Sequence, residues 1–170
     1  IGHSDFLREK GITPVHELRG VGENLRDHYS PRVRFEITEK NATFNDNGRG
    51  WKLAREAVKY AVTGQGFFAM TAAPIRMYFK TREGLESPDA AIAMTPFLYE
   101  LDKNGHLKIA KQRGVTLNIN VLRSESIGSI HVKSTDPFEP PAINFNFMSS
   151  EYDRQGTVAA IRKAREIFAT

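Results

Sequence analysis

The sequence predicts an α+β domain in which an antiparallel sheet of five or six strands is covered on one face by helices. Three observations support this class. Several short segments alternate apolar and polar residues with a period of two, which is typical of half-buried strands. These segments mostly follow one another along the chain, and helical patterns lie between and after them, as in sheets built from sequential strands. The 170 residues, 40% of them hydrophobic, suffice for one domain with a core.

The N-terminal part contains a short helix, a glycine-rich loop and a first strand. Ser4 is a suitable N-cap for a helix over residues 5–10, and Gly11 follows at the position that favours glycine. Residues 20–28 read Gly-Val-Gly-Glu-Asn-Leu-Arg-Asp-His and form a loop, because two glycines permit tight backbone turns. Apolar residues occupy every second position of residues 33–37 and predict a strand.

The middle of the chain alternates between turns, one helix and further strands. Turn-forming residues at 45–48 lead into a helix over residues 51–62. The apolar residues that share one face of this helix are Trp51, Ala54, Val58, Ala61 and Val62. Alternation predicts strands over residues 75–79 and 90–98, and a turn follows at residues 102–105.

The C-terminal part begins with the clearest period-two segment, residues 115–121. A turn over residues 124–128 is predicted to reverse it into a strand over 129–133, which would form a hairpin. The proline-rich residues 136–141 can be neither central strand nor helix and predict a stiff connection to the last helix. That helix is capped by Ser150, and its expected apolar face carries Val158, Ile161 and Phe168.

Composition excludes several classes of function. The net charge is +4, and its excess of basic residues is mixed with acidic ones, so we expect no nucleic-acid partner. The longest unbroken apolar run, residues 90–94, is far shorter than the roughly 20 residues of a membrane-spanning helix, and we expect no transmembrane segment. There is no cysteine, and the histidines lack the spacing of a zinc site, so no metal site is predicted.

The sequence lacks the Gly-x-Ser-x-Gly motif of serine hydrolases and the phosphate-binding loop of nucleotide hydrolases. Gly20-Val21-Gly22 begins like a dinucleotide-binding fingerprint, but Leu25 stands where the third glycine belongs. The loop over residues 20–28 nevertheless gathers Asn24, Asp27 and His28 around one apolar residue, Leu25. It either fixes the chain direction before the next strand or approaches a ligand, and the residues alone leave both interpretations open. The polar face of the 115–121 strand is equally open, as solvent-facing surface or as the wall of a cleft.

The residues of this loop and of a second segment, 126–143, resemble the glucose–methanol–choline (GMC) oxidoreductases, flavoenzymes that oxidise alcohols. The segments that agree with the family in order and rough spacing are residues 1–12, 18–28, 43–46, 60–66, 82–89 and 126–143. The sequence departs from the common family pattern at residues 124–128, where many members have Pro-x-Ser-Arg-Gly.

The resemblance implies a larger parent protein. Members bind FAD through an N-terminal Gly-x-Gly-x-x-Gly unit and carry a catalytic histidine after the last helix found here, and this chain contains neither. We therefore expect residues 1–170 to be the substrate-binding portion of a longer flavoenzyme, inactive alone, with the FAD domain of the same polypeptide as its partner. In the family, a histidine takes the hydroxyl proton of the substrate while a hydride passes to the flavin.

Site residues follow from the same resemblance. The chain is expected to supply no catalytic residue and no metal ligand. The residues expected on the flavin side are Gly22, Asn24, Leu25, Asp27 and His28. Tyr78, Phe97 and Asn118 are expected on the surface that selects a small alcohol such as choline. The expected location is the cytoplasm, and the alternative is a parent protein bound peripherally to a membrane. The competing hypotheses for function are a stand-alone β-rich binding module and a lyase of the same fold.

Overall fold

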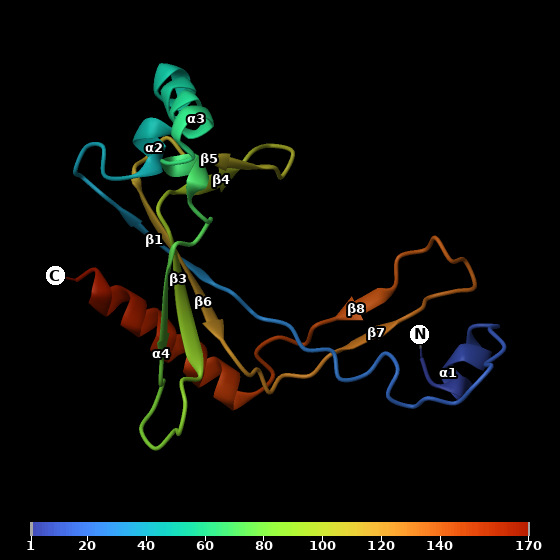
Figure 1. Cartoon of the computed structure of the whole chain (residues 1–170). Coiled ribbons are helices and arrows are strands. Elements are labelled where there is room, and N and C mark those ends of the chain that lie inside the picture. Colours follow the sequence, from blue (N-terminus) through green and yellow to red (C-terminus); the bar gives the residue numbers. More distant parts are fainter. Residues whose placement is uncertain (1, 170) are drawn as a thin grey trace. The chain divides into compact units, whose positions relative to one another are not determined.

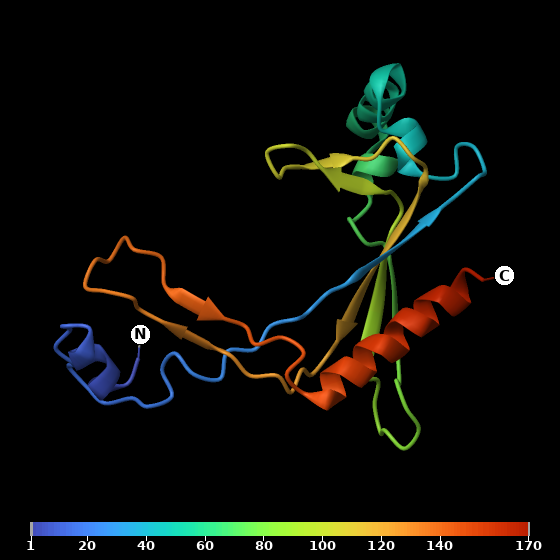
Figure 2. The same cartoon turned by 180° about the vertical axis from the view of Figure 1, so that it is seen from behind.

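A computed structural model describes residues 2–169, which form two compact units. One unit contains the chain up to Tyr29 together with Val121–Thr157, and the other contains Ser30–Asn120 and the residues from Val158 onward. We call them the first and the second unit. Figures 1 and 2 show their elements from two sides, with helices and strands mixed along the chain. The predicted α+β class is confirmed.

The second unit is built on a four-stranded sheet with the strand order β1-β6-β3-β2. The strands are β1 (Arg32–Glu36), β2 (Ile75–Phe79), β3 (Ala90–Thr95) and β6 (Gly114–Val121). β1 pairs antiparallel with β6, and β2 pairs antiparallel with β3. The described residues thus place four strands in the main sheet, and four more strands form two small sheets, whereas the sequence predicted one sheet of five or six.

Helix α4 (Glu151–Ile167) provides the core of the second unit with its C-terminal half. Ala160 and Ala164 are fully buried and pack against one face of the sheet, because their small side chains let the helix approach the strands closely. The buried sheet residues beneath them are Ala90, Ile92, Leu117 and Ile119. Ile161 and Phe168 pack against this core as predicted, but Val158 is 47% exposed and does not belong to it.

Two helices precede β2. The predicted turn at residues 45–48 is wrong in its first three residues, because Phe44–Asn47 form a one-turn helix, α2, ended by Gly48. α3 (Gly50–Thr63) matches the predicted helix and is ended by Gly64 in the left-handed conformation (φ 65°). A 3₁₀ turn, η1, follows at Phe67–Ala69.

The apolar face of α3 is turned to solvent. Trp51 is 69% exposed, Val58 62% and Val62 79%, and no residue of the helix is buried. A periodic apolar pattern therefore identified the helix correctly without identifying a core contact.

The remaining strands form two hairpins. In the second unit β4 (Tyr99–Leu101) pairs with β5 (Leu107–Ile109) across the turn predicted at residues 102–105. In the first unit β7 (Ser129–His131) pairs with β8 (Ala142–Asn144). The predicted hairpin between the 115–121 strand and the strand after it is therefore wrong, and the proline-rich segment 136–141 connects β7 to β8 instead of leading directly to the last helix.

Gly128 explains the pairing of β7. A Cβ atom at this position would collide with the carbonyl oxygen of Asn144 and lie 2.8 Å from the carbonyl carbon of Phe145, so only glycine lets β8 approach here. On the other side, Gly128 exchanges two backbone hydrogen bonds with Leu25, at 3.0 and 2.8 Å. The first unit also contains α1 (Ser4–Glu9), whose N-cap is His3 where the sequence predicted Ser4.

The first turn of α4 is tied to the loop between β6 and β7 through a buried carboxylate, Asp153. Asp153 accepts hydrogen bonds from the Ser124 hydroxyl (2.6 Å) and from the backbone amides of Glu125 (3.0 Å) and Ser126 (2.8 Å). Burial raises the pKa of this carboxyl, but the hydrogen bonds outweigh burial and hold it below its ordinary 3.8. The loop at residues 124–126 is thus held to the helix by a charged acceptor.

In the described part of the chain, no helix has the length and apolarity needed to cross a membrane.

Candidate functional site

An aromatic pocket in the second unit is the strongest candidate site. Its volume is about 380 Å³, and its lining is mostly apolar. The residues that line it are Ala72, Thr95, Phe97, Tyr99, Leu107, Lys108 and Ile109. We call this set the aromatic pocket. An apolar concavity with a few polar groups at its edge suits a small organic ligand.

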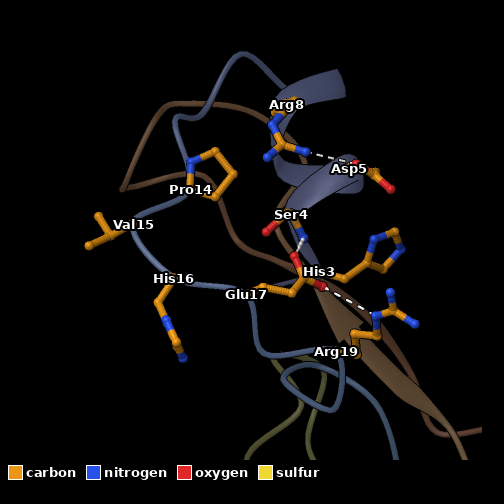
Figure 3. A pocket seen from close by; sticks show the side chains of 9 residues that line it. All are labelled: His3, Ser4, Asp5, Arg8, Pro14, Val15, His16, Glu17 and Arg19. Carbon is orange, nitrogen blue, oxygen red and sulfur yellow. Dashed lines mark hydrogen bonds and ion pairs between the residues drawn. The ribbon is translucent and has the colours of Figure 1, made fainter.

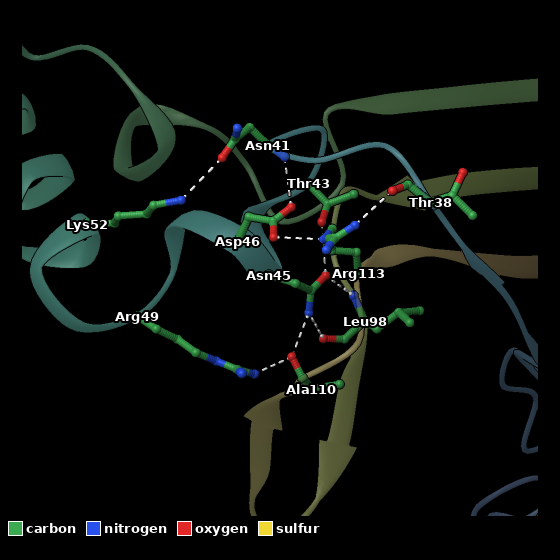
Figure 4. A network of polar contacts seen from close by, with 10 residues as sticks. All are labelled: Thr38, Asn41, Thr43, Asn45, Asp46, Arg49, Lys52, Leu98, Ala110 and Arg113. Carbon is green, nitrogen blue, oxygen red and sulfur yellow. Dashed lines mark hydrogen bonds and ion pairs between the residues drawn. The ribbon is translucent and has the colours of Figure 1, made fainter.

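The β4–β5 hairpin supplies most of this pocket, and a buried asparagine holds the hairpin in place (Figure 4). Asn45 donates hydrogen bonds to the carbonyl oxygens of Leu98 (2.8 Å) and Ala110 (3.0 Å), and it accepts one from the Leu98 amide (2.9 Å). Leu98 lies between Phe97 and Tyr99, and Ala110 follows the end of β5. One side chain therefore fixes both ends of the hairpin.

An ion pair and further hydrogen bonds support α2 around Asn45. The Arg113 guanidinium lies 2.9 Å from the Asp46 carboxylate and donates to the Thr38 carbonyl oxygen at 2.8 Å. Arg49 donates to the carbonyl oxygens of Ile109 and Ala110. Figure 4 shows these groups converging between α2 and the base of the hairpin, which explains why residues 44–47 adopt a helical turn there.

A polar edge adjoins the aromatic pocket on the face of the sheet opposite α4. The Asn118 amide donates to the Thr95 hydroxyl at 3.2 Å, and its oxygen accepts from the Tyr99 hydroxyl at 3.5 Å. Thr95 and Tyr99 both line the pocket, so Asn118 is linked to it through two of its walls. The polar face of the predicted 115–121 strand thus lies beside an apolar pocket.

Two arginines of β1 flank the same aromatic ring. The guanidinium carbons of Arg32 and Arg34 lie 5.2 and 5.7 Å from the centre of the Tyr99 ring. These are cation–π distances, and the alternation of strand residues places both side chains on one face of β1. The register pairs Arg32 with Asn118 and Arg34 with Thr116, which puts the arginines beside the polar edge.

The three residues predicted for a substrate surface are thus placed differently. Phe97 lines the aromatic pocket, and Asn118 is hydrogen-bonded to two of its residues. Tyr78 lies on β2 opposite Ala91, is 54% exposed and does not line the pocket. The sequence interpretation did not assign Tyr99, Arg32 or Arg34 to the site, and the Arg-Val-Arg alternation on β1 was the signal that could have indicated them.

The five residues predicted for a flavin side all lie in the first unit. The carbonyl oxygen of Gly22 accepts from the Ile130 amide at 2.8 Å, and the positive φ of Gly22 (90°) permits this turn. Leu25 forms an isolated bridge with Gly128, and the side chain of Asn24, whose φ is 58°, is exposed. The loop is therefore pinned by its backbone while its polar side chains stay exposed.

Asp27 and His28 form the end of this loop. The Asp27 carboxylate accepts from the His28 amide at 2.7 Å. The His28 Nδ1 lies 3.0 Å from the Val121 carbonyl oxygen, which can only accept, so Nδ1 carries the proton and Nε2 is the acceptor of the neutral ring. A pocket of about 430 Å³ adjoins them, lined by Arg26, Asp27, His28, Leu122, Arg123 and Ser124.

A third pocket, of about 690 Å³, lies at the N-terminal helix (Figure 3). Its charged groups are paired with one another: Arg8 lies 2.8 Å from Asp5, and Arg19 lies 3.8 Å from Glu17. The hydrogen bond from Ser4 is the largest cause of a lowered pKa of Glu17. None of the predicted site residues lines this pocket. Within residues 2–169, no three His, Cys, Asp or Glu side chains are grouped so that they could hold a metal ion.

Comparison with known proteins relates this geometry to a family. The fold recurs in a formate oxidase, with a TM-score of 0.81 at 18% sequence identity over 97% of this chain and 33% of that one. It also recurs in an FAD-dependent oxidoreductase from Chaetomium thermophilum, with a TM-score of 0.72 at 18% identity over 99% of this chain and 34% of that one. The chain therefore has the fold of a segment of larger oxidoreductases.

Sequence comparison shows similarity to one family of oxidoreductases. Residues 124–170 match the family model described as GMC oxidoreductase. Over 167 residues, 98% of the chain, the sequence is 33% identical to the oxygen-dependent choline dehydrogenase of Escherichia coli O127:H6. The chain is thus similar to GMC oxidoreductases, in its last 47 residues by the family model and over nearly its whole length by this relative. It spans 29% of the length of that choline dehydrogenase.

Proposed function

We propose that this chain is the substrate-binding portion of a longer FAD-dependent oxidoreductase that acts on the CH–OH group of a small alcohol. The observation that carries the proposal is the aromatic pocket with its polar edge, on the sheet face that α4 leaves free. The relatives support the reaction class, because one is named a choline dehydrogenase and one an FAD-dependent oxidoreductase.

The pocket residues divide the work of substrate binding. Phe97, Leu107 and Ile109 offer apolar surface to the non-reacting end of the alcohol. Asn118 and the Tyr99 hydroxyl offer hydrogen bonds that would orient the hydroxyl-bearing end. Binding and orientation are the contributions of these residues, and we assign the chain no catalytic residue.

FAD is the proposed cofactor, and when bound it supplies the acceptor for the hydride of the substrate. The loop at residues 20–28 has features that suit contact with a flavin. Its backbone is fixed by Gly22 and Leu25, and it presents Asn24, Asp27 and the acceptor Nε2 of His28 as exposed polar groups beside a pocket. Backbone turns at glycine allow a planar ligand to approach closely. We propose that these five residues contact the flavin. The proposed partner of the chain is the FAD domain of the same polypeptide, and the proposed location of the protein is the cytoplasm.

The test is anaerobic flavin reduction by alcohols in the full-length polypeptide that contains this chain. A set of small primary alcohols should bleach the flavin absorbance, and Phe97→Ala should raise KM about tenfold through lost apolar contact, with a smaller change in kcat. Tyr78→Ala, outside the pocket, is the matched aromatic control and should leave KM unchanged. A polypeptide without flavin, or flavin that no alcohol reduces, would refute the proposal. The 170-residue chain alone should lose flavin on gel filtration.

A further inference from the structure

The charge around the aromatic pocket is more informative about the substrate than its shape. Arg32 and Arg34 both place a guanidinium against the Tyr99 ring. Among the described residues, neither arginine forms an ion pair with a carboxylate. Lys108, which lines the pocket, is the third cation and is 3.4 Å from the Glu100 carboxylate. Positive charge therefore exceeds negative charge at this edge.

The remaining charged groups nearby do not reverse this balance. Glu36 follows the two arginines on the same face of β1, but the register pairs it with Gly114, two residues before Thr116, the partner of Arg34. Arg76 lies on the same sheet face, opposite Ala93 of β3, and adds another positive charge. The side chain hydrogen-bonded to both the Tyr99 and the Thr95 hydroxyl is that of Asn118, which is neutral.

Binding of a quaternary ammonium needs aromatic faces that are free and preferably a nearby carboxylate. The Tyr99 ring already has two cations against it, and a third cation in the pocket would be repelled by both. An apolar body without positive charge meets no such penalty beside Phe97 and Ile109.

We propose that the alcohol bound in the aromatic pocket carries no positive charge, and that Arg32 and Arg34 are the residues that exclude cationic alcohols. This proposal rests on the proposed function, and it separates the substrate of this protein from that named for its choline dehydrogenase relatives. The arginines act as specificity residues through charge, while the apolar wall binds the body of the substrate.

A pair of isosteric alcohols isolates the charge. Choline and 3,3-dimethylbutan-1-ol have the same shape, but a carbon replaces the ammonium nitrogen in the second. At a separation of about 6 Å and the dielectric constant of water, each guanidinium should disfavour choline about 3-fold, so the pair should disfavour it about 10-fold. The ratio of kcat/KM values of the full-length enzyme should favour the neutral alcohol by at least this factor.

Substitution then tests the residues. Arg32→Gln with Arg34→Gln should lower this ratio about 10-fold, mainly by lowering KM for choline. Arg55→Gln removes one positive charge from α3, outside the pocket, and should leave the ratio unchanged. A wild-type enzyme that uses choline as well as the neutral alcohol, or a ratio that the double variant does not change, would overturn the proposal.

A second measurement separates this proposal from the proposed function. NMR titration of the 170-residue chain compares the binding of the two alcohols without any turnover, using shifts of Tyr99 and Ile109 resonances. If the full-length enzyme oxidises neither alcohol, the proposed reaction on such alcohols fails, while weaker binding of choline than of its isostere would still support charge exclusion. Equal or tighter binding of choline would refute charge exclusion by itself.

Discussion

Asn45 offers the most direct test of how the pocket is supported. Replacement by alanine removes three hydrogen bonds to backbone groups of Leu98 and Ala110. Both carbonyl oxygens keep another donor, but the Leu98 amide, held at 2.9 Å by the asparagine oxygen, loses its partner in a buried position. A neutral hydrogen bond contributes about 1 kcal/mol, and a stranded amide costs about 1 kcal/mol or more. We expect Asn45→Ala to lower the free energy of unfolding by about 3 kcal/mol.

Urea unfolding followed by the fluorescence of Trp51, the only tryptophan, measures this change in the same unit. Asn104→Ala, at an exposed position, is the matched control and should change stability by less than about 0.5 kcal/mol. Asn45→Asp should be at least as destabilising as the alanine variant, because a carboxylate cannot donate to the two carbonyl oxygens. A loss below about 1 kcal/mol for Asn45→Ala, with an unchanged slope against urea, would refute the view that this side chain fixes the hairpin.

Two further predictions concern the first unit. Asp153→Asn should destabilise the chain by about 2 kcal/mol near neutral pH, since it removes the charge from three hydrogen bonds, whereas the exposed control Asp5→Asn should have little effect. Because folding lowers the pKa of Asp153, the carboxylate stabilises the fold fully above pH 3.8, its ordinary pKa, and this stabilisation is lost as the pH falls through the lowered pKa. The difference in unfolding free energy between wild type and Asp153→Asn, measured with urea, should therefore vanish in acid. A difference that stays constant with pH would contradict this origin. Gly128→Ala should cost at least about 2 kcal/mol and abolish amide exchange protection in β7 and β8, because the new methyl group collides with the Asn144 carbonyl oxygen. Gly20→Ala, with no atom within 4 Å of its Cβ position, is the control, and equal protection in both variants would contradict the steric argument.

Local periodicity explains which elements the sequence could predict. Strands β1, β2, β3 and β6 and helices α3 and α4 all follow from the spacing of apolar residues, which depends only on neighbours in the chain. Pairing is not local, and the partner of β7 lies beyond the proline-rich connection at residues 136–141. β8 can approach here because Gly128 has no side chain, and the residues of the turn do not predict that contact. The helical turn α2 likewise depends on bonds from Asn45 to residues more than 50 positions away.

Some residues of the candidate site could be predicted from the sequence, and others required the pairing of the strands. Phe97 and Asn118 were expected on a substrate surface because of the family resemblance, and the structure brings both to one pocket or its polar edge. Tyr99 could not be distinguished from a core aromatic, because its role depends on the β4–β5 hairpin. Assigning Arg32 and Arg34 required the register of β1 on β6, since a shift of one residue would move both side chains to the face covered by α4.

That register also explains how a substrate preference can change within one fold. The formate oxidase keeps the backbone arrangement with fewer than one residue in five identical, so the fold tolerates replacement of most side chains. The pocket charge, in contrast, is set by two alternating positions on one strand, at the edge of the four-stranded sheet. Exposed positions on such a strand can be exchanged with little effect on the core, because the intervening Val33 and Phe35 alone pack against it. If Arg32 and Arg34 exclude cationic alcohols as proposed, selection for a different alcohol can act on these two positions without disturbing the scaffold. Overall identity to a choline dehydrogenase would then be a weaker guide to the substrate than the charge at these two positions.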